Sequence, residues 1–149
     1  MEKEIESLID SIAEKFQEKE TKKLELEKLK KAAGKTADYK SSCSTCSALL
    51  DELKENLHHL IKQHSLPKSD MAAHKKVRTK LLEHLRTEHG IIEKGYYTSL
   101  YMSLGIAIGL PFGLLLFDNV ALGLPIGLSI GLAIGAGADH EKEKKGKVL

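Results

Sequence analysis

The chain has 149 residues, a net charge of +2 and 30% charged residues, and its mean hydropathy is −0.23. Nearly all of the charge lies before residue 95 or after residue 138, so these averages hide a long apolar stretch in between. The near-neutral balance gives no general case for a nucleic-acid partner, and the remaining sequence, about 95 residues, suffices for one small helical domain with an extension.

Residues 3–33 are predicted to form one long polar helix. The a and d spacing of a coiled coil is met by two groups of apolar residues: Ile5, Leu8 and Ile12, then Leu26, Leu29 and Ala33. Lys19 occupies an a position between them and residues 17–23 are wholly polar, so a coiled coil would be interrupted, and a solvated helix or a frayed arm fits equally well. Gly34 is expected to end this helix, and residues 1–40 form an N-terminal unit of charged helix and connector.

Residues 41–94 are predicted to form an antiparallel helical hairpin. A first helix over 47–64 has one apolar face, made of Leu49, Leu50, Leu53, Leu57, Leu60 and Ile61. Pro67 breaks it, and Ser69 or Asp70 is expected to cap a second helix that runs to about His89 and is closed by Gly90. Its inward residues are Val77, Leu81, Leu82 and Leu85. The similar lengths and the five-residue connection favour antiparallel pairing.

Cys43-Ser-Thr-Cys46 is the motif of this unit with chemical content. Two thiolates at this spacing can bind one zinc ion, and two further cysteine or histidine ligands complete a tetrahedron. Two histidine pairs are candidates. His59 and His64 match the spacing of a zinc finger with two cysteines and two histidines, whereas His84 and His89 would adjoin Cys46 in an antiparallel hairpin.

The hairpin geometry favours the later histidine pair. His64 would lie about 25 Å from Cys46, at the far end of a continuous helix. We therefore predict a structural zinc held by Cys43, Cys46, His84 and His89. Because the chain has seven histidines, the competing interpretation is that this spacing arises by chance and that no metal is bound. A thioredoxin-like redox role needs a strand-rich context, which is lacking, and no nearby carboxylate or pocket suggests an enzyme.

Two uncharged apolar segments, residues 100–117 and 120–138, are joined at Asp118 and Asn119. Each is about 27–28 Å long as a helix, close to a hydrocarbon core of about 30 Å. Small residues at every second position also fit a β-hairpin, but the glycine content, Pro111, Pro125 and the unpaired strand edges in lipid oppose it. The sequence thus predicts a two-span helical hairpin over 95–138 and a charged tail over 139–149.

Glycines recur every four residues in both segments, at Gly105, Gly109, Gly113, Gly123, Gly127, Gly131 and Gly135. These runs resemble the glycine-zipper membrane segments of small bacterial proteins, some of which form oligomeric channels. The resemblance covers about residues 100–137 and implies close helix packing and homo-oligomerisation. A second small-residue stripe lies on the opposite face: Ser99, Ser103, Ala107, Pro111, Ala121, Pro125, Ser129 and Ala133. A lone hairpin uses one face of each helix, so we expect neighbouring copies.

Basic residues flank the spans, at Lys75, Lys76, Arg78, Lys80, Arg86 and Lys94 before them and at Lys142, Lys144, Lys145 and Lys147 after them. The positive-inside rule then places both termini in the cytoplasm and the protein in a bacterial inner membrane. Tyr96, Tyr97 and Tyr101 fit an aromatic belt at the interface.

The sequence therefore predicts an all-α, non-enzymatic membrane protein that homo-oligomerises. Two functions fit this description. One is a pore-forming or membrane-perturbing effector, holin-like in its two spans and Lys-rich tail, with a cytoplasmic regulatory domain. The other is a membrane-anchored scaffold or adaptor without permeation. The expected partners are membrane lipid, further copies of the chain and an unidentified cytoplasmic protein.

Overall fold

A computed structural model describes residues 2–149, and its regular structure is α-helical apart from one isolated β-bridge. The helices are α1 (Glu2–Lys15), α2 (Glu18–Leu24), α3 (Leu26–Asp38), α4 (Ser44–Lys62), α5 (Lys68–His89), α6 (Tyr96–Phe117) and α7 (Val120–Lys144). The prediction of an all-α fold is confirmed. The chain divides into two compact units, one ending at Gly90 and the other formed by Ile91–Val148, and each is described by itself.

The single helix expected over residues 3–33 is instead three helices. The first break lies at Phe16 and Gln17, and the second at Glu25, whose φ of 51° is left-handed. Because residues 17–23 offer no apolar face, a straight helix would leave two separate apolar stripes in water. Folding back at the breaks buries both stripes in one core. Gly34 does not end α3, which continues to Asp38.

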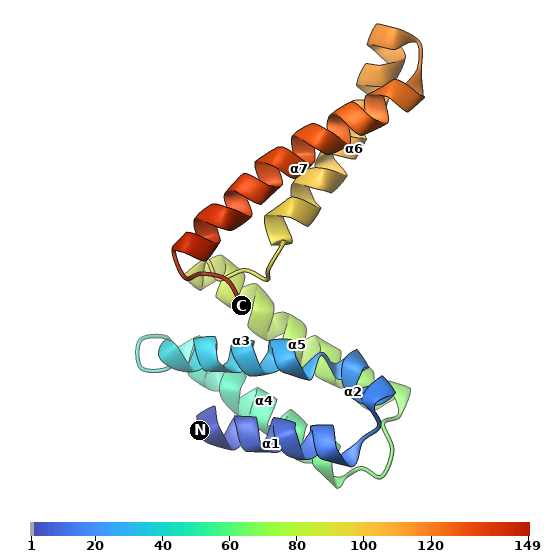
Figure 1. Ribbon diagram of the computed structural model, residues 1–149. Helices are drawn as coiled ribbons and strands as arrows, with labels where there is room; N and C mark the ends of the chain where they lie inside the picture. The colour runs from blue at the N-terminus through green and yellow to red at the C-terminus, as the bar shows by residue number, and fades with distance from the viewer. Residues whose placement is uncertain (1) are drawn as a thin grey trace. The chain divides into compact units, whose positions relative to one another are not determined.

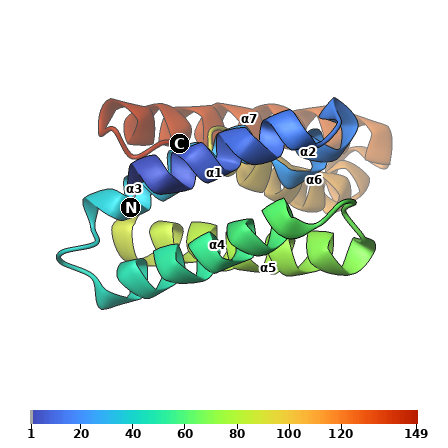
Figure 2. The same cartoon turned by 90° about the horizontal axis from the view of Figure 1, so that it is seen from below.

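Helices α1, α3, α4 and α5 form a four-helix bundle in which successive long helices run in alternating directions (Figures 1 and 2). Helix α2 links α1 to α3 and contacts α5. The buried apolar side chains of the helices and of two connections are Ile5, Ile9, Ile12, Phe16, Leu24, Leu26, Leu29, Ala32, Ala33, Cys46, Leu49, Leu50, Leu53, Leu57, Leu60, Leu66, Val77, Leu81 and Leu85. Ile9 rather than the expected Leu8 faces this core.

The α4–α5 hairpin forms as predicted, with shifted ends. Helix α4 begins three residues before the predicted start because Cys43 acts as its N-cap. Helix α5 begins at Lys68 behind Pro67, so the expected cap at Ser69 or Asp70 is wrong. The proline ring fixes φ near −65°, and Pro67 adopts an extended conformation as the N-cap residue of α5. No side chain caps this helix. Gly90 ends α5 with a φ of 65°, a left-handed conformation that glycine adopts easily because it has no Cβ atom.

Helices α6 and α7 pack closely along their glycine faces to form the second unit (Figure 1). A Cβ atom added at Gly113 would lie 2.6 Å from the Cα atom of Gly123, and one added at Gly127 would overlap the carbonyl oxygen of Gly105. Such backbone contact is open only to glycine. The turn lies at Asp118 and Asn119 as predicted, and the Asn119 side chain accepts a 3.0 Å hydrogen bond from the Ala121 amide.

The outer surface of the hairpin is apolar. Its exposed large side chains are Leu100, Leu104, Ile108, Phe112, Leu114, Leu115, Leu116, Phe117, Val120, Leu122, Leu124, Ile126, Ile130, Leu132 and Ile134. Both helices are long and apolar enough to cross a membrane, with α6 having 22 residues and α7 having 25. A continuous exposed apolar surface of this kind is unfavourable in water and is typical of proteins that associate with a membrane.

The base of the hairpin is closed by two non-local links. Asp139 of α7 accepts hydrogen bonds from the backbone amides of Tyr97 and Thr98, each at 2.9 Å, and from the Thr98 hydroxyl at 2.6 Å. The chain then turns at Gly146, and the Ile92 amide donates to the carbonyl of Lys147 at 3.0 Å. Both ends of the hairpin unit are therefore held together where the apolar surface stops.

Candidate metal centre

Three segments of the bundle meet at the candidate site: the end of α3, the start of α4 and the end of α5. Cys43 and Cys46 lie at the first turn of α4, and His84 and His89 lie in the last turns of α5. The helices run antiparallel, so the first residues of one adjoin the last residues of the other. Side chains from 38 to 43 residues apart thereby meet.

A tight turn fixes the position of Cys43. The backbone amides of Ser42 and Cys43 both donate to the carbonyl of Tyr39, at 3.1 and 2.8 Å. Cys43 then adopts the extended backbone of an N-cap, and its sulfur accepts a 3.4 Å hydrogen bond from the Cys46 amide. The two sulfurs therefore lie at the same helix terminus, one half-buried and the other fully buried.

The four side chains converge on one point. Nε2 of His84 lies 3.3 Å from the sulfur of Cys43 and 3.3 Å from that of Cys46, and Nε2 of His89 lies 3.2 Å from the Cys46 sulfur. One potential ligand atom from each residue lies within 4.8 Å of all the others. The clustering of Cys43, Cys46, His84 and His89 expected from sequence is thus present in the structure.

These distances fit a tetrahedral metal site. With Zn–S bonds of about 2.3 Å and Zn–N bonds of about 2.0 Å, neighbouring sulfur and nitrogen ligands lie about 3.5 Å apart. The observed sulfur–nitrogen distances of 3.2 and 3.3 Å are slightly shorter, so small side-chain rotations would accommodate the ion. Two thiolates would also neutralise the charge of a divalent cation, which suits a partly buried site.

The two thiols differ in their electrostatic surroundings. The Cys46 amide hydrogen bond is the main cause that lowers the pKa of Cys43 below its usual value. Burial is the main cause that raises the pKa of Cys46 to about 12, with the adjacent Cys43 adding to it. In the metal-free protein Cys43 is therefore the more readily ionised of the two, and metal binding must displace a proton from Cys46.

Tyr39 covers one histidine of the cluster. Its ring stacks on that of His89 with centroids 3.9 Å apart and an angle of 24° between the planes. The ring of His84 meets that of His89 edge to face at 5.3 Å. Tyr39 is not among the site residues predicted from sequence, although its position shortly before Cys43 could have indicated it. Its ring extends the site to the end of α3.

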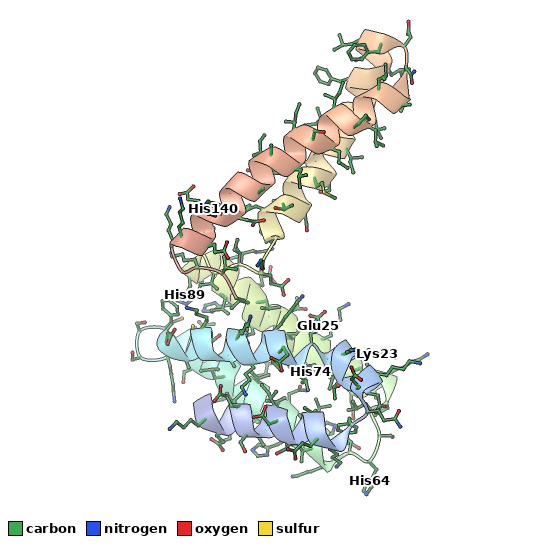
Figure 3. The ribbon with its side chains drawn as sticks, in the orientation of Figure 1. Lys23, Glu25, His64, His74, His89 and His140 are labelled. Atoms are coloured by element: carbon green, nitrogen blue, oxygen red, sulfur yellow. The ribbon has the colours of Figure 1, made fainter. Side chains whose placement is uncertain are left out.

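The alternative histidines lie elsewhere. Figure 3 shows His64 at the opposite end of the bundle from His89. His59 lies on α4 with its Nε2 3.3 Å from a carboxylate oxygen of Asp70. His74 is fully buried, with Nδ1 2.7 Å from Asn56 Oδ1 and Nε2 3.3 Å from the Leu24 carbonyl. Within the described residues, none of these three belongs to a cluster of metal-binding side chains.

The seven glycines form a second set of predicted site residues. Each of them packs against backbone of the other helix within the same hairpin: Gly105, Gly109, Gly113, Gly123, Gly127, Gly131 and Gly135. Gly131 meets the carbonyl of Tyr101, and Gly135 meets the Cα atom of Thr98. The glycine face is therefore occupied inside one chain, and a role between chains stays a prediction. Asp139, which links the two helices at the base of the hairpin, is not among the residues predicted from sequence, although its position directly after the second apolar segment could have indicated it.

Comparison of the chain with protein-family models, curated proteins and solved structures gave no match.

Proposed function

We propose that this chain is a non-enzymatic, two-span membrane anchor that holds a zinc-stabilised helical bundle at the membrane surface, where the bundle acts as a scaffold or adaptor. The observation that carries the proposal is the construction of the α6–α7 hairpin. Its interior contact is made by glycine backbone, while its large apolar side chains point outward. In water this arrangement would be unfavourable, and in lipid it is the stable one.

The surface of the hairpin favours an anchor over a pore. Ser103 and Ser129 lie on its exposed face, and their hydroxyls donate to carbonyls of their own helix, at Leu100 and Pro125. Their hydrogen-bonding capacity is thus used locally, as in other membrane helices. The two spans, residues 100–117 and 120–138, contain no charged side chain that would line a water-filled path, and Asp118 lies in the turn between them.

The metal centre supports a structural role for zinc. Its ligands come from α4 and α5, and Tyr39 adds the end of α3, so an ion there would hold three segments together. The cluster consists of two cysteines and two histidines, and all four protein ligands are used, which is typical of structural zinc and leaves no open position for a substrate. Zinc would add stability to a bundle of modest size.

The proposed topology has both termini on the cytoplasmic side of a bacterial inner membrane. Two antiparallel spans bring both ends to the same side. Lys94, Lys142, Lys144, Lys145 and Lys147 lie at that side of the spans, and the turn carries only Asp118. Tyr96, Tyr97 and Tyr101 gather at the start of α6, with neighbouring ring centroids 5.3 and 6.3 Å apart, as an interfacial aromatic belt would.

The zinc site is tested by the metal content of the full chain purified in detergent micelles. We expect one zinc per chain, with most of it lost in His84→Ala and retained in the matched variant His59→Ala. The two histidines belong to the competing ligand sets, so the pair of variants separates them. Zinc loss in His59→Ala alone, or a metal-free wild type under reducing conditions, would refute this site.

The membrane function is tested in bacterial cells. We expect the chain to resist extraction by alkaline carbonate, reporters on either terminus to be cytoplasmic, and membrane potential to be unchanged on induction. A fall in potential that requires intact spans would instead support the pore-forming effector. Release by carbonate would refute the anchor itself.

Homo-oligomerisation is a further part of this proposal, and we propose a contact face for it. Since the glycine face is occupied within the hairpin, neighbouring copies would meet through the exposed small-residue stripe that contains Ala107 and Ala133. Ala107→Leu with Ala133→Leu should then lower the native mass in detergent, whereas Leu115→Ala, on a large exposed side chain, should leave it unchanged. A monomeric wild type would remove oligomerisation from the proposal.

A further inference from the structure

We propose that Cys43 and Cys46 form an oxidation-sensitive pair, in which a two-electron oxidant such as hydrogen peroxide joins the two sulfurs and releases the zinc ion. The release step rests on the proposed zinc site, whereas disulfide formation needs only the two thiols. Zinc would then stabilise the bundle under reducing conditions, and its release under oxidative stress would destabilise the bundle.

The two sulfurs are placed for a disulfide. They lie within 4.8 Å of each other at one helix terminus, and both are free thiols. A disulfide joins sulfurs at about 2.05 Å, so side-chain rotation about the Cα–Cβ bonds has to bring them together by less than about 3 Å. The chain has no third cysteine, so an intramolecular disulfide can form only between these two residues.

The pair is asymmetric in a way that assigns each sulfur a role. Cys43 is half-buried at the N-cap position, and the Cys46 amide donates a hydrogen bond to its sulfur. Because Cys43 is only half-buried, an oxidant can reach its sulfur. Cys46 is fully buried directly behind it. Cys43 would therefore react first, and Cys46 would resolve the product.

The chemistry is balanced with peroxide as the oxidant. The Cys43 thiolate attacks one peroxide oxygen, the O–O bond breaks, and hydroxide leaves and is protonated to water, which gives a sulfenic acid at Cys43. The Cys46 thiolate then attacks that sulfur, the S–O bond breaks, and a second hydroxide leaves as water after protonation. In total the two thiolates lose two electrons, and peroxide with two protons gives two water molecules.

Loss of the ion follows from the change in its ligands. A disulfide sulfur carries no negative charge, so the two strongest ligands of the site disappear together. His84 and His89 remain, and two neutral imidazoles bind zinc far more weakly than the full set of four ligands. Reduction of the disulfide by a dithiol would restore both thiolates, so binding would be reversible.

The test uses the full chain in detergent micelles, loaded with zinc and then exposed to hydrogen peroxide. The zinc content of the reduced protein is measured first. A chromogenic chelator then follows zinc release, and mass spectrometry follows the loss of two hydrogens and the cross-linked peptide. We expect one zinc ion released for each Cys43–Cys46 disulfide formed, and zinc rebinding after dithiothreitol is added and then removed.

Cys43→His is the matched control, because it keeps four ligands and cannot form the disulfide. Its zinc release at the same peroxide dose should be slower by at least about tenfold. Cys46→His serves the same purpose if the first variant folds poorly. Equal release from wild type and control, or zinc retained while a reference thiol is oxidised, would overturn the inference and leave the zinc site intact. A reduced chain without zinc would refute the proposed zinc site and with it the release step.

Discussion

The carboxylate of Asp139 caps the helix that begins at Tyr96, through a 2.6 Å hydrogen bond from the Thr98 hydroxyl and 2.9 Å hydrogen bonds from the Tyr97 and Thr98 amides. The residue at the N-cap position of α6 is Gly95, which has no side chain to serve these amides. The cap is therefore supplied by the other helix of the hairpin, from 41 residues away.

Asp139→Ala should loosen the base of the hairpin. The change leaves two backbone amides and one hydroxyl without their acceptor, at a cost of about 1–2 kcal/mol. We expect faster hydrogen exchange at the Tyr97 and Thr98 amides in micelles, with Asp139→Asn between wild type and alanine because one acceptor oxygen remains. Glu141→Ala is the control, since its carboxylate pairs with Lys145, the C-cap residue of the same helix. Unchanged exchange in Asp139→Ala would contradict the capping role.

Gly127→Ala should separate α6 from α7. The added methyl group would overlap the carbonyl oxygen of Gly105, and backbone on both sides leaves no side chain that could move away. Overpacking of this kind costs about 1–3 kcal/mol. Gly137→Ala is the matched control on the same helix, because a Cβ atom there meets nothing within 4 Å. Unfolding by titration with sodium dodecyl sulfate measures both, and equal stabilities would refute the close contact.

Protonation of His74 should destabilise the bundle. Burial is the main cause that lowers the pKa of His74, and the Arg78 guanidinium adds to it, against the opposing effect of the Leu24 carbonyl. Arg78 in turn pairs with Glu25 at 3.1 Å. Figure 3 shows Glu25 near His74. Asn56, the remaining polar neighbour, is uncharged.

The direction of the pH effect follows from the lowered pKa. Below about pH 6.5 the histidine of the unfolded chain binds a proton, whereas His74 in the folded chain does not. The free energy of unfolding therefore decreases as the pH is lowered, by up to about 1.4 kcal/mol per pH unit, until the pH reaches the pKa of the folded state. His74→Gln should be less stable at neutral pH and show a shallower slope between pH 7 and 5. The free energy of unfolding of both proteins is measured by urea denaturation, with the proteins free of zinc and their cysteines reduced. Equal slopes would show that His74 does not contribute.

Leu53→Ala should cost about 3 kcal/mol in the stability of the bundle, since the side chain is fully buried in α4 and its removal leaves a cavity. The same substitution at Leu115, which is 80% exposed on the hairpin, should cost less than about 0.5 kcal/mol in micelles. Denaturant unfolding of each variant gives the comparison. A large loss in Leu115→Ala would indicate that this side chain contacts protein instead of lipid or detergent.

The sequence by itself determined the features that depend on local pattern. Two apolar segments with glycines every four residues predicted a helical hairpin, and Gly90 predicted the end of α5, since a residue with positive φ favours glycine. Two similar apolar faces with a short, proline-containing connection predicted the α4–α5 pair. From that pairing alone, His84 and His89 could be preferred to His59 and His64 as neighbours of Cys46.

Only the tertiary structure decided the contacts between segments distant in sequence. Residues 3–33 have the helical periodicity of one long helix, but burying Ile12 and Leu29 in a common core requires breaks at Gln17 and Glu25. The glycine stripe indicated close packing without indicating a partner, and its partner is the other helix of the same chain. Asp139 likewise became a helix cap because that packing brings it to the amide of Thr98. Periodicity specifies the face that a helix buries, and the free energy of packing selects what covers that face.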